Sequence, residues 1–122
     1  MKLRIKGNSI RIRLSKTEVD DLVSGSIQHD STSFGNSSFG YTVQPVNYEG
    51  SLFAGYDNNT ITLYVPKALL KDWSENSVVG FETMMPLENS GHLQLLLEKD
   101  FKCIDKTMED QSDLFDNPAK TC

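Results

Sequence analysis

The sequence has 122 residues, a length that is typical of a single domain. A hydrophobic fraction of 38% and a charged fraction of 24% argue against a disordered or fibrous chain. No apolar run approaches the ~20 residues of a membrane span, and the alternating charges after Met1 are unlike a signal peptide. With only two cysteines, we expect one cytoplasmic domain over residues 1–122 and no membrane partner.

The charge is unevenly distributed along the chain. Residues 1–16 contain six Lys and Arg residues and no acid, whereas residues 105–116 contain five acids and one lysine. The formal net charge is −5, which argues against a general nucleic-acid binder. We therefore do not expect specific nucleic-acid binding.

The chain opens with the pattern of a β-hairpin followed by a helix. Residues 2–6 and 9–14 alternate polar and apolar side chains, which indicates two half-buried strands, and the Gly-Asn pair between them favours a tight turn. Ser15 and Glu18 have the spacing of a capping box. The sequence therefore predicts a hairpin and then a helix over residues 16–24.

Two further strands are predicted after this helix, at residues 26–30 and 39–46. The polar stretch 31–38 between them is typical of a mobile loop. Pro45 lacks a backbone N–H donor, so the second strand is better placed at a sheet edge.

The second half of the chain repeats this order of elements. Residues 52–57 and 60–65 predict a second hairpin, and the proline that follows suits the start of a helix over 67–75. Residues 77–84 and 92–98 then predict another pair of strands.

The two halves predict an internal repeat, residues 1–47 and residues 52–98. A shift of 51 residues without a gap superposes the predicted turn, inward strand positions, helix start and helix stripe. The alternative is two unrelated segments with a similar order of elements. We expect an α+β domain of about eight mostly antiparallel strands, in a curved sheet or partly open barrel, with two short helices. A flat antiparallel sheet with both helices on one face is the second possibility.

The apolar positions of this pattern predict the core. The expected buried residues are Leu3, Ile5, Ile10, Ile12, Leu14, Leu22, Ile61, Leu63, Val65, Leu70, Trp73, Phe81, Leu93, Leu95 and Leu97.

The outer face of the first hairpin is a candidate anion-binding site. Its residues are Lys2, Arg4, Lys6, Arg11 and Arg13, which the alternation places on one side. Arginine makes planar two-point contacts to phosphate, but the face has no aromatic residue to stack a nucleic-acid base. The alternative is a solvated face, or one partly neutralised by the acidic segment.

The potential metal ligands are few and far apart in the sequence. They are Cys103, Cys122, His29 and His92. Structural zinc sites have close pairs of ligands, which this sequence lacks. We therefore expect ordinary roles for these side chains, and neither a metal nor another cofactor.

Two features could support catalysis. Lys102 precedes Cys103, and a neighbouring lysine lowers a thiol pKa, but no histidine lies near in sequence to act as a base. Glu98 and Asp100 are two residues apart, so a continuing strand would place both carboxylates on one side. Neither arrangement is a catalytic motif, and we assign no catalytic residue.

Segments at both ends of the chain resemble a small bacterial protein family of unknown function. They are KLRIKGNSIRIRLSKTEVDDL (2–22), EKDFKCID (98–105), ED (109–110) and LFDNP (114–118). The resemblance implies a small protein with no assigned activity, so it assigns no functional residue. We expect a non-catalytic binding or accessory module with a protein partner or anionic ligand. The alternative is a binder or enzyme of phosphorylated ligands that uses the basic face.

The acidic C-terminal tail, residues 99–122, has few apolar residues and no periodicity. Such a composition is typical of partial disorder. The basic outer face of the first hairpin, however, offers a surface of opposite charge. We therefore expect residues 105–116 to pack on the domain, with Phe101 and Phe115 in apolar notches.

Overall fold

The computed structural model describes residues 1–102, 113 and 115, and these contain eight strands and two helices. In chain order they are β1 (Lys2–Ile5), β2 (Ser9–Leu14), α1 (Lys16–Val23), β3 (Gln28–Ser33), β4 (Ser38–Val46), β5 (Phe53–Asp57), β6 (Thr60–Pro66), α2 (Lys67–Leu70), β7 (Gly80–Pro86) and β8 (His92–Lys99).

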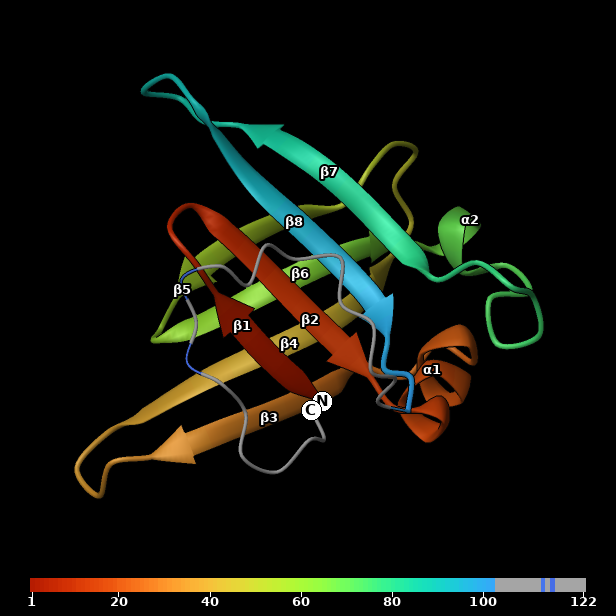
Figure 1. The fold of residues 1–122 in the computed structure, drawn as a ribbon, viewed down its shortest axis with the longest axis horizontal. Helices are drawn as coiled ribbons and strands as arrows, with labels where there is room; N and C mark the ends of the chain where they lie inside the picture. Colours follow the sequence, from red (N-terminus) through yellow and green to blue (C-terminus); the bar gives the residue numbers. More distant parts are fainter. Residues whose placement is uncertain (103–112, 114, 116–122) are drawn as a thin grey trace.

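The strands form two separate four-stranded sheets (Figure 1). Sheet A has the order β1-β2-β8-β7, and sheet B has the order β3-β4-β6-β5. The four hairpin pairs are antiparallel, but the central pairs β2–β8 and β4–β6 are parallel. The α+β content is confirmed. The predicted single curved sheet or partly open barrel is wrong, because α1 and α2 each carry the chain from one sheet to the other.

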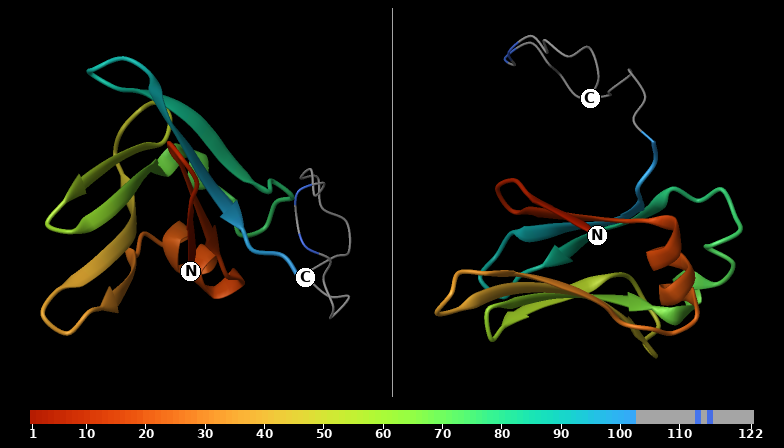
Figure 2. Two further views of the ribbon diagram at one scale, coloured as in Figure 1. Left: turned by 60° about the vertical axis from the view of Figure 1, so that its left-hand side comes forward. Right: turned by 90° about the horizontal axis from the view of Figure 1, so that it is seen from below.

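The core lies between the sheets, which pack face to face (Figure 2). Of the predicted core, ten residues are buried, and Leu3, Ile10, Phe81 and Leu93 are partly buried against them. Val19, Val43 and Leu52 are also buried. Ile5 was wrongly predicted, because it is 53% exposed. It ends β1 beside the hairpin turn, at the end of the sheets opposite the helices (Figure 2).

The two helices close one end of the sheet pair (Figure 2). The predicted capping box of α1 is present: Ser15 Oγ accepts from the Glu18 N–H, and Glu18 Oε1 accepts from the Ser15 N–H. Helix α2 ends at Leu70, well before the predicted residue 75. Asp72 has a φ of +60°, which lies outside the right-handed helical region, so the helix cannot extend through this residue. Trp73 is nevertheless fully buried in the turn that follows.

Residues 31–38 form a hairpin and not the predicted loop. Strand β3 extends to Ser33 and β4 begins at Ser38, with a hydrogen bond from Phe34 N–H to Ser37 O closing the turn between them. The expected edge position of Pro45 is also wrong, because β4 lies between β3 and β6. The pairing with β3 ends at Val43, so the missing N–H of Pro45 interrupts no bond on that side.

Both halves have the order hairpin, helix, hairpin, and each sheet takes one hairpin from each half. The ungapped shift fails before the last strand. Thr60 pairs with Gly40, but Ser9, 51 residues earlier, pairs with Gln94 and not with Gly91. A repeat would thus need an insertion before β8. That residues 1–47 and 52–98 superpose stays a prediction.

Candidate anion-binding face

The cations of the first hairpin lie on the outer face of sheet A. Ile12 and Leu14 point into the core, so the alternation of the strand places Arg11 and Arg13 on the opposite face. In the register between β1 and β2, Arg4 lies opposite Arg11 and Lys2 lies opposite Arg13. The structure thus brings four of the five predicted residues into one group. We call Lys2, Arg4, Arg11 and Arg13 the basic face.

The fifth residue, Lys6, lies apart from these paired positions. It follows the end of β1, and its backbone N–H donates to Ser9 O at 3.0 Å in the turn. Its side chain is exposed at the tip of the hairpin. Lys6 can therefore add long-range charge to the site but does not belong to the paired group.

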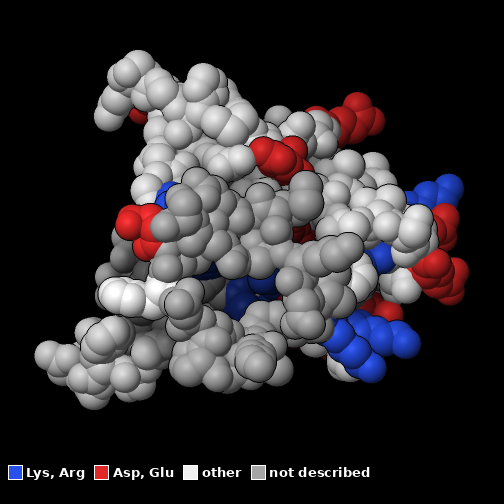
Figure 3. All heavy atoms as spheres, viewed as in Figure 1, with Lys and Arg blue, Asp and Glu red and all other residues white. Residues whose placement is uncertain are grey.

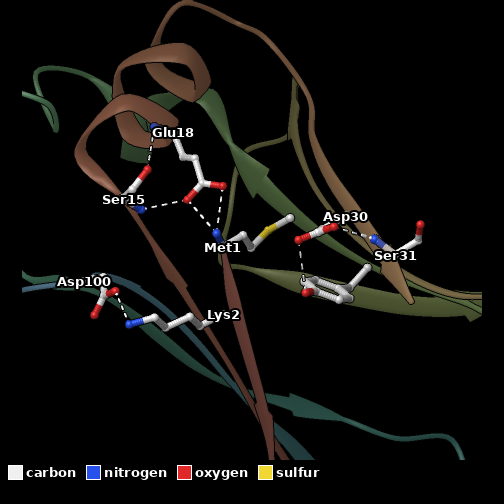
Figure 4. Close-up of polar contacts among 8 residues, drawn as sticks. Met1, Lys2, Ser15, Glu18, Asp30, Ser31 and Asp100 are labelled. Atoms are coloured by element: carbon white, nitrogen blue, oxygen red, sulfur yellow. Dashed lines mark hydrogen bonds and ion pairs between the residues drawn. The ribbon is translucent and has the colours of Figure 1, made fainter. Parts of the chain in front are cut away.

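Two carboxylates border the basic face. Glu98 Oε1 lies 3.2 Å from Arg11 Nε and 3.6 Å from Arg13 Nε. This contact follows from the parallel pairing of β2 and β8, in which Glu98 is the partner of Arg13. Asp100 Oδ2 lies 2.8 Å from Lys2 Nζ (Figure 4). The sequence placed Glu98 and Asp100 on one side of a strand but did not show that they contact the cations.

Arg11 retains an unsatisfied donor at this contact. Its Nε is buried and has no hydrogen-bond partner in the described chain, although the Glu98 oxygen is within ion-pair distance. The pair is therefore held by charge and not by a well-directed hydrogen bond. A ligand oxygen placed in line with this N–H would supply the missing acceptor.

The start of β1 is held by the amino group of the chain. The Met1 ammonium lies 2.9 Å from each oxygen of Glu18 (Figure 4). Burial raises the pKa of Glu18, but the hydrogen bonds from Ser15 and from the terminal ammonium outweigh it, so the pKa is lowered overall. This cluster joins the first turn of α1 to the edge of sheet A, next to Lys2.

Sheet A also carries a polar network on the side of β7. Gln94 Oε1 accepts from Ser9 Oγ at 2.9 Å, and Gln94 Nε2 donates to Glu82 Oε1 at 2.7 Å. The network spans β2, β8 and β7 and holds the side chain of Gln94. Gln94 lies on the same face of β8 as Glu98. Cations therefore occupy the β1–β2 side of the face, and neutral and acidic groups occupy the β7 side. Cationic atoms are visible over β1 and β2 in the space-filling view (Figure 3).

The two candidate metal ligands that the structure describes, His29 and His92, lie in different sheets. His29 is in sheet B, where its Nδ1 lies 2.7 Å from Thr42 Oγ1. His92 begins β8 in sheet A, and its carbonyl accepts from Asn8 Nδ2 at 2.8 Å. Cys103 and Cys122 lie outside the described residues. Within residues 1–102, 113 and 115, no group of three His, Cys, Asp or Glu side chains is arranged for a metal.

The prediction for the acidic tail is tested only at its described positions. Phe101 is 62% exposed and Phe115 is fully exposed, so the prediction that these two rings fill apolar notches is wrong: neither is buried. Residues 103–112, which hold most of the predicted packing segment, lie outside the described residues.

In the part of the chain that is described, no helix has the length and apolarity to span a bilayer.

Comparison with known proteins identifies the family but no activity. Residues 1–119 match the family described as a family of unknown function, DUF7009. The chain belongs to this family, which confirms the resemblance to a family without an assigned role. No curated protein and no solved structure matches the chain.

Proposed function

We propose that this protein is a non-catalytic binding module, and that the basic face receives an anionic partner. One observation carries the proposal: Arg4 lies opposite Arg11, and Lys2 lies opposite Arg13, on one face of a hairpin. Like charges directly opposite each other destabilise a strand pair. An anion that lies across both pairs relieves this repulsion, so anion binding also stabilises the hairpin of β1 and β2.

The carboxylates next to the basic face support a binding role. Glu98 contacts both Arg11 and Arg13, and Asp100 contacts Lys2. Each carboxylate thus serves as a counterion, which an incoming anion can replace at the same cations. Arginine suits such an exchange because its planar guanidinium binds carboxylate and phosphate oxygens in pairs.

The acidic tail is the intramolecular partner that we propose for the basic face. Residues 105–116 carry five acids, and Asp100, a few residues earlier, lies at the border of the face through its contact with Lys2. A tethered acidic segment has a high effective concentration at a nearby cationic surface. It would therefore compete with an external anion and select against weak ligands.

The alternative is a binder or enzyme of phosphorylated ligands. The specific observation in its favour is the unsatisfied Nε–H of Arg11, which a phosphate oxygen could accept. We also propose, from the cysteine content and the sequence resemblance, that the protein is bacterial and acts in the cytoplasm. The two possibilities differ in the ligand that they require, so a comparison of a phosphate ligand with an acidic peptide separates them.

The test uses inorganic tripolyphosphate and a synthetic peptide of residues 105–116. We expect both to raise the melting temperature of the full chain, and the double variant Arg11→Gln/Arg13→Gln to lose most of the increase. The double variant Lys67→Gln/Lys71→Gln is the matched control, since it removes the same charge at α2, away from sheet A. Equal responses of the two double variants would contradict the proposal. A response to tripolyphosphate alone would favour the alternative.

A chain that ends at Lys102 tests the intramolecular part of the proposal. It retains every described helix and strand. We expect it to bind tripolyphosphate more tightly than the full chain, and more so at low salt, because exposed charges are screened by ions. If the two chains bind tripolyphosphate equally, the tail does not compete for the basic face.

A further inference from the structure

We propose that a groove beside the start of α1 is a second site, separate from the basic face, for a small carboxylate with an apolar body. The groove is lined by residues of α1, by the end of β8 and by the residues that follow β8. Its volume is about 290 Å³, close to the lower end of the range for small-molecule sites. No part of the proposed anion-binding function depends on it.

The groove has an apolar floor and one aromatic wall. Leu14 and Val19 form the floor, and both are buried members of the core. Phe101 lines the groove although it is 62% exposed. An exposed aromatic ring next to a concave apolar surface is a typical site for the apolar part of a ligand.

Three polar side chains at the rim have no partner among the described residues. Lys16, Ser74 and Lys102 line the groove, and none of their side chains has a hydrogen bond or ion pair among the described residues. A third lysine, Lys99, is already engaged: its Nζ donates to Asn76 O at 2.8 Å and lies 5.6 Å from the Trp73 ring centroid. Two lysines and one hydroxyl therefore remain as donors for a ligand.

The carboxylates of the groove do not cancel these donors. Asp100 lines the groove, but its Oδ2 is held by Lys2 at 2.8 Å. Asp20 is one turn after Lys16 on α1 and makes no ion pair with it in the structure. With Asp100 and Lys99 engaged, Lys16 and Lys102 oppose Asp20 alone, and the remaining charge is positive. A ligand with one negative head group and an apolar body matches both parts of the groove.

The test compares three compounds that share one apolar chain: octanoate, octan-1-ol and octylammonium. Each is titrated into the full chain in the presence of the fluorescent probe 8-anilinonaphthalene-1-sulfonate. We expect octanoate to displace the probe at a concentration about tenfold lower than octylammonium does, with octan-1-ol between them, because the rim selects the charge. Equal displacement by octanoate and octylammonium would overturn the proposal.

Variants then locate the site. Lys16→Glu and Lys102→Glu should each weaken octanoate binding about tenfold by reversing a rim charge. Phe101→Ala should weaken all three compounds, since it removes apolar contact. The control is Lys71→Glu, which makes the same charge change at a smaller hollow between α1 and α2. The Arg11→Gln/Arg13→Gln variant should bind octanoate like the wild type.

Three results would overturn the proposal. In the first, Lys71→Glu weakens octanoate as much as Lys102→Glu does, so that only net charge matters. In the second, Arg11→Gln/Arg13→Gln abolishes octanoate binding, so that the groove is not a separate site. In the third, the full chain binds none of the three compounds, so that the groove is covered by the chain itself or by a second copy.

Discussion

The two sheets contribute alike to the core but differ in their outer faces. In sheet A, the outward positions beside Ile12 are Arg11 and Arg13, and Glu98 lies outward beside Leu97. In sheet B, the residues beside Val43 and Leu63 are Thr42, Gln44, Thr62 and Tyr64, which carry no formal charge, and no strand of this sheet contains lysine or arginine. The strand order is equivalent in both sheets. The inward residues therefore account for the similar sheets, whereas the outward residues give the two outer faces different charges.

The outer face of sheet B is stabilised by uncharged contacts. Phe53 stacks on Tyr64 with 4.7 Å between ring centroids, and Tyr48 packs on the edge of Phe53 at 5.1 Å. His29 and Thr42 contact each other on the same face. Aromatic contacts of this kind are insensitive to salt, whereas the exposed charge pairs of sheet A are weakened by it. Salt therefore acts mainly on sheet A.

The largest expected effect comes from the core that both sheets share. Trp73 is fully buried, donates from Nε1 to Val78 O at 2.9 Å, and lies 5.0 Å from the Phe81 ring. We expect Trp73→Ala to lower the free energy of unfolding by ~3–5 kcal/mol, measured by urea denaturation. Tyr56→Ala is the control in an exposed aromatic residue, with an expected change within about 0.5 kcal/mol. A loss below about 1 kcal/mol at Trp73 would contradict the assignment of the core.

The next effect compares the edge strands of the two sheets. A Cβ atom at Gly80 in β7 would clash with Leu97 O and lie 2.8 Å from Glu98 Cα, whereas a Cβ at Gly55 in β5 would meet nothing within 4 Å. Gly80→Ala should therefore cost ~1–3 kcal/mol, as overpacking does. Gly55→Ala should be neutral or stabilise by up to about 1 kcal/mol, because it restricts the unfolded chain. Thermal unfolding of both variants measures the difference, and equal costs would show that the β7–β8 edge yields without strain.

The third effect concerns the attachment of α1 to the edge of sheet A. Glu18→Ala removes half of the capping box and the partner of the Met1 ammonium, and we expect a loss of about 1 kcal/mol near pH 7. The pKa of Glu18 is lowered in the folded state, so its charge contributes stability above the ordinary carboxyl pKa. That contribution is lost as the pH falls through the lowered folded value.

The pH dependence of the unfolding free energy separates the charge of Glu18 from its role in helix capping. The difference in unfolding free energy between wild type and Glu18→Ala should shrink as the pH falls below about 4. A difference that does not change between neutral and acid pH would mean that the carboxylate charge contributes nothing, and that the remaining cost is one of helix capping alone.

The smallest expected change in stability has the clearest consequence for function. Glu98→Gln removes the charge that contacts Arg11 and Arg13, and we expect these partly exposed pairs to contribute only ~0.2–1 kcal/mol. The same change removes a counterion from the basic face, so tripolyphosphate should bind several-fold more tightly. Calorimetry measures the affinity, and Asp57→Asn in sheet B is the matched control. Weaker binding by Glu98→Gln would mean that Glu98 positions the arginines for the ligand.

Alternation of side chains made much of this fold predictable. The strands Ser9–Leu14, Thr60–Pro66 and His92–Lys99 follow from their buried positions, and so does the gathering of the cations on one face. The hairpin partners followed from the turns between the strands, but the pairing of one hairpin with another was not predictable, because a period of two residues is the same for every neighbour. The parallel pairing of β2 with β8 is therefore what sequence reasoning missed, and with it the contacts of Glu98.

Local features of the backbone and sequence explain the remaining differences between the predicted and the observed elements. The stretch 31–38 is polar on both faces, so it has no alternation to reveal the ends of β3 and β4. The spacing of Leu69, Leu70 and Trp73 fits a helix, but the backbone turns at Asp72 with a positive φ and still buries the indole. The groove at α1 combines residues distant in sequence, such as Val19 and Phe101, and no single motif could have predicted it.

The exchange of hairpins between the halves has a consequence for how the chain folds. Strand β2 pairs with β8, whose partner positions are more than 80 residues later, so sheet A cannot be completed until most of the chain has been synthesised. Contacts of such long sequence separation slow folding, because loop closure precedes the gain from pairing. During synthesis, the hairpin of β1 and β2 has neither its sheet neighbour nor the opposing sheet, and an isolated hairpin is marginally stable. We therefore expect the two halves to fold interdependently in a late, cooperative step, and neither half to fold on its own.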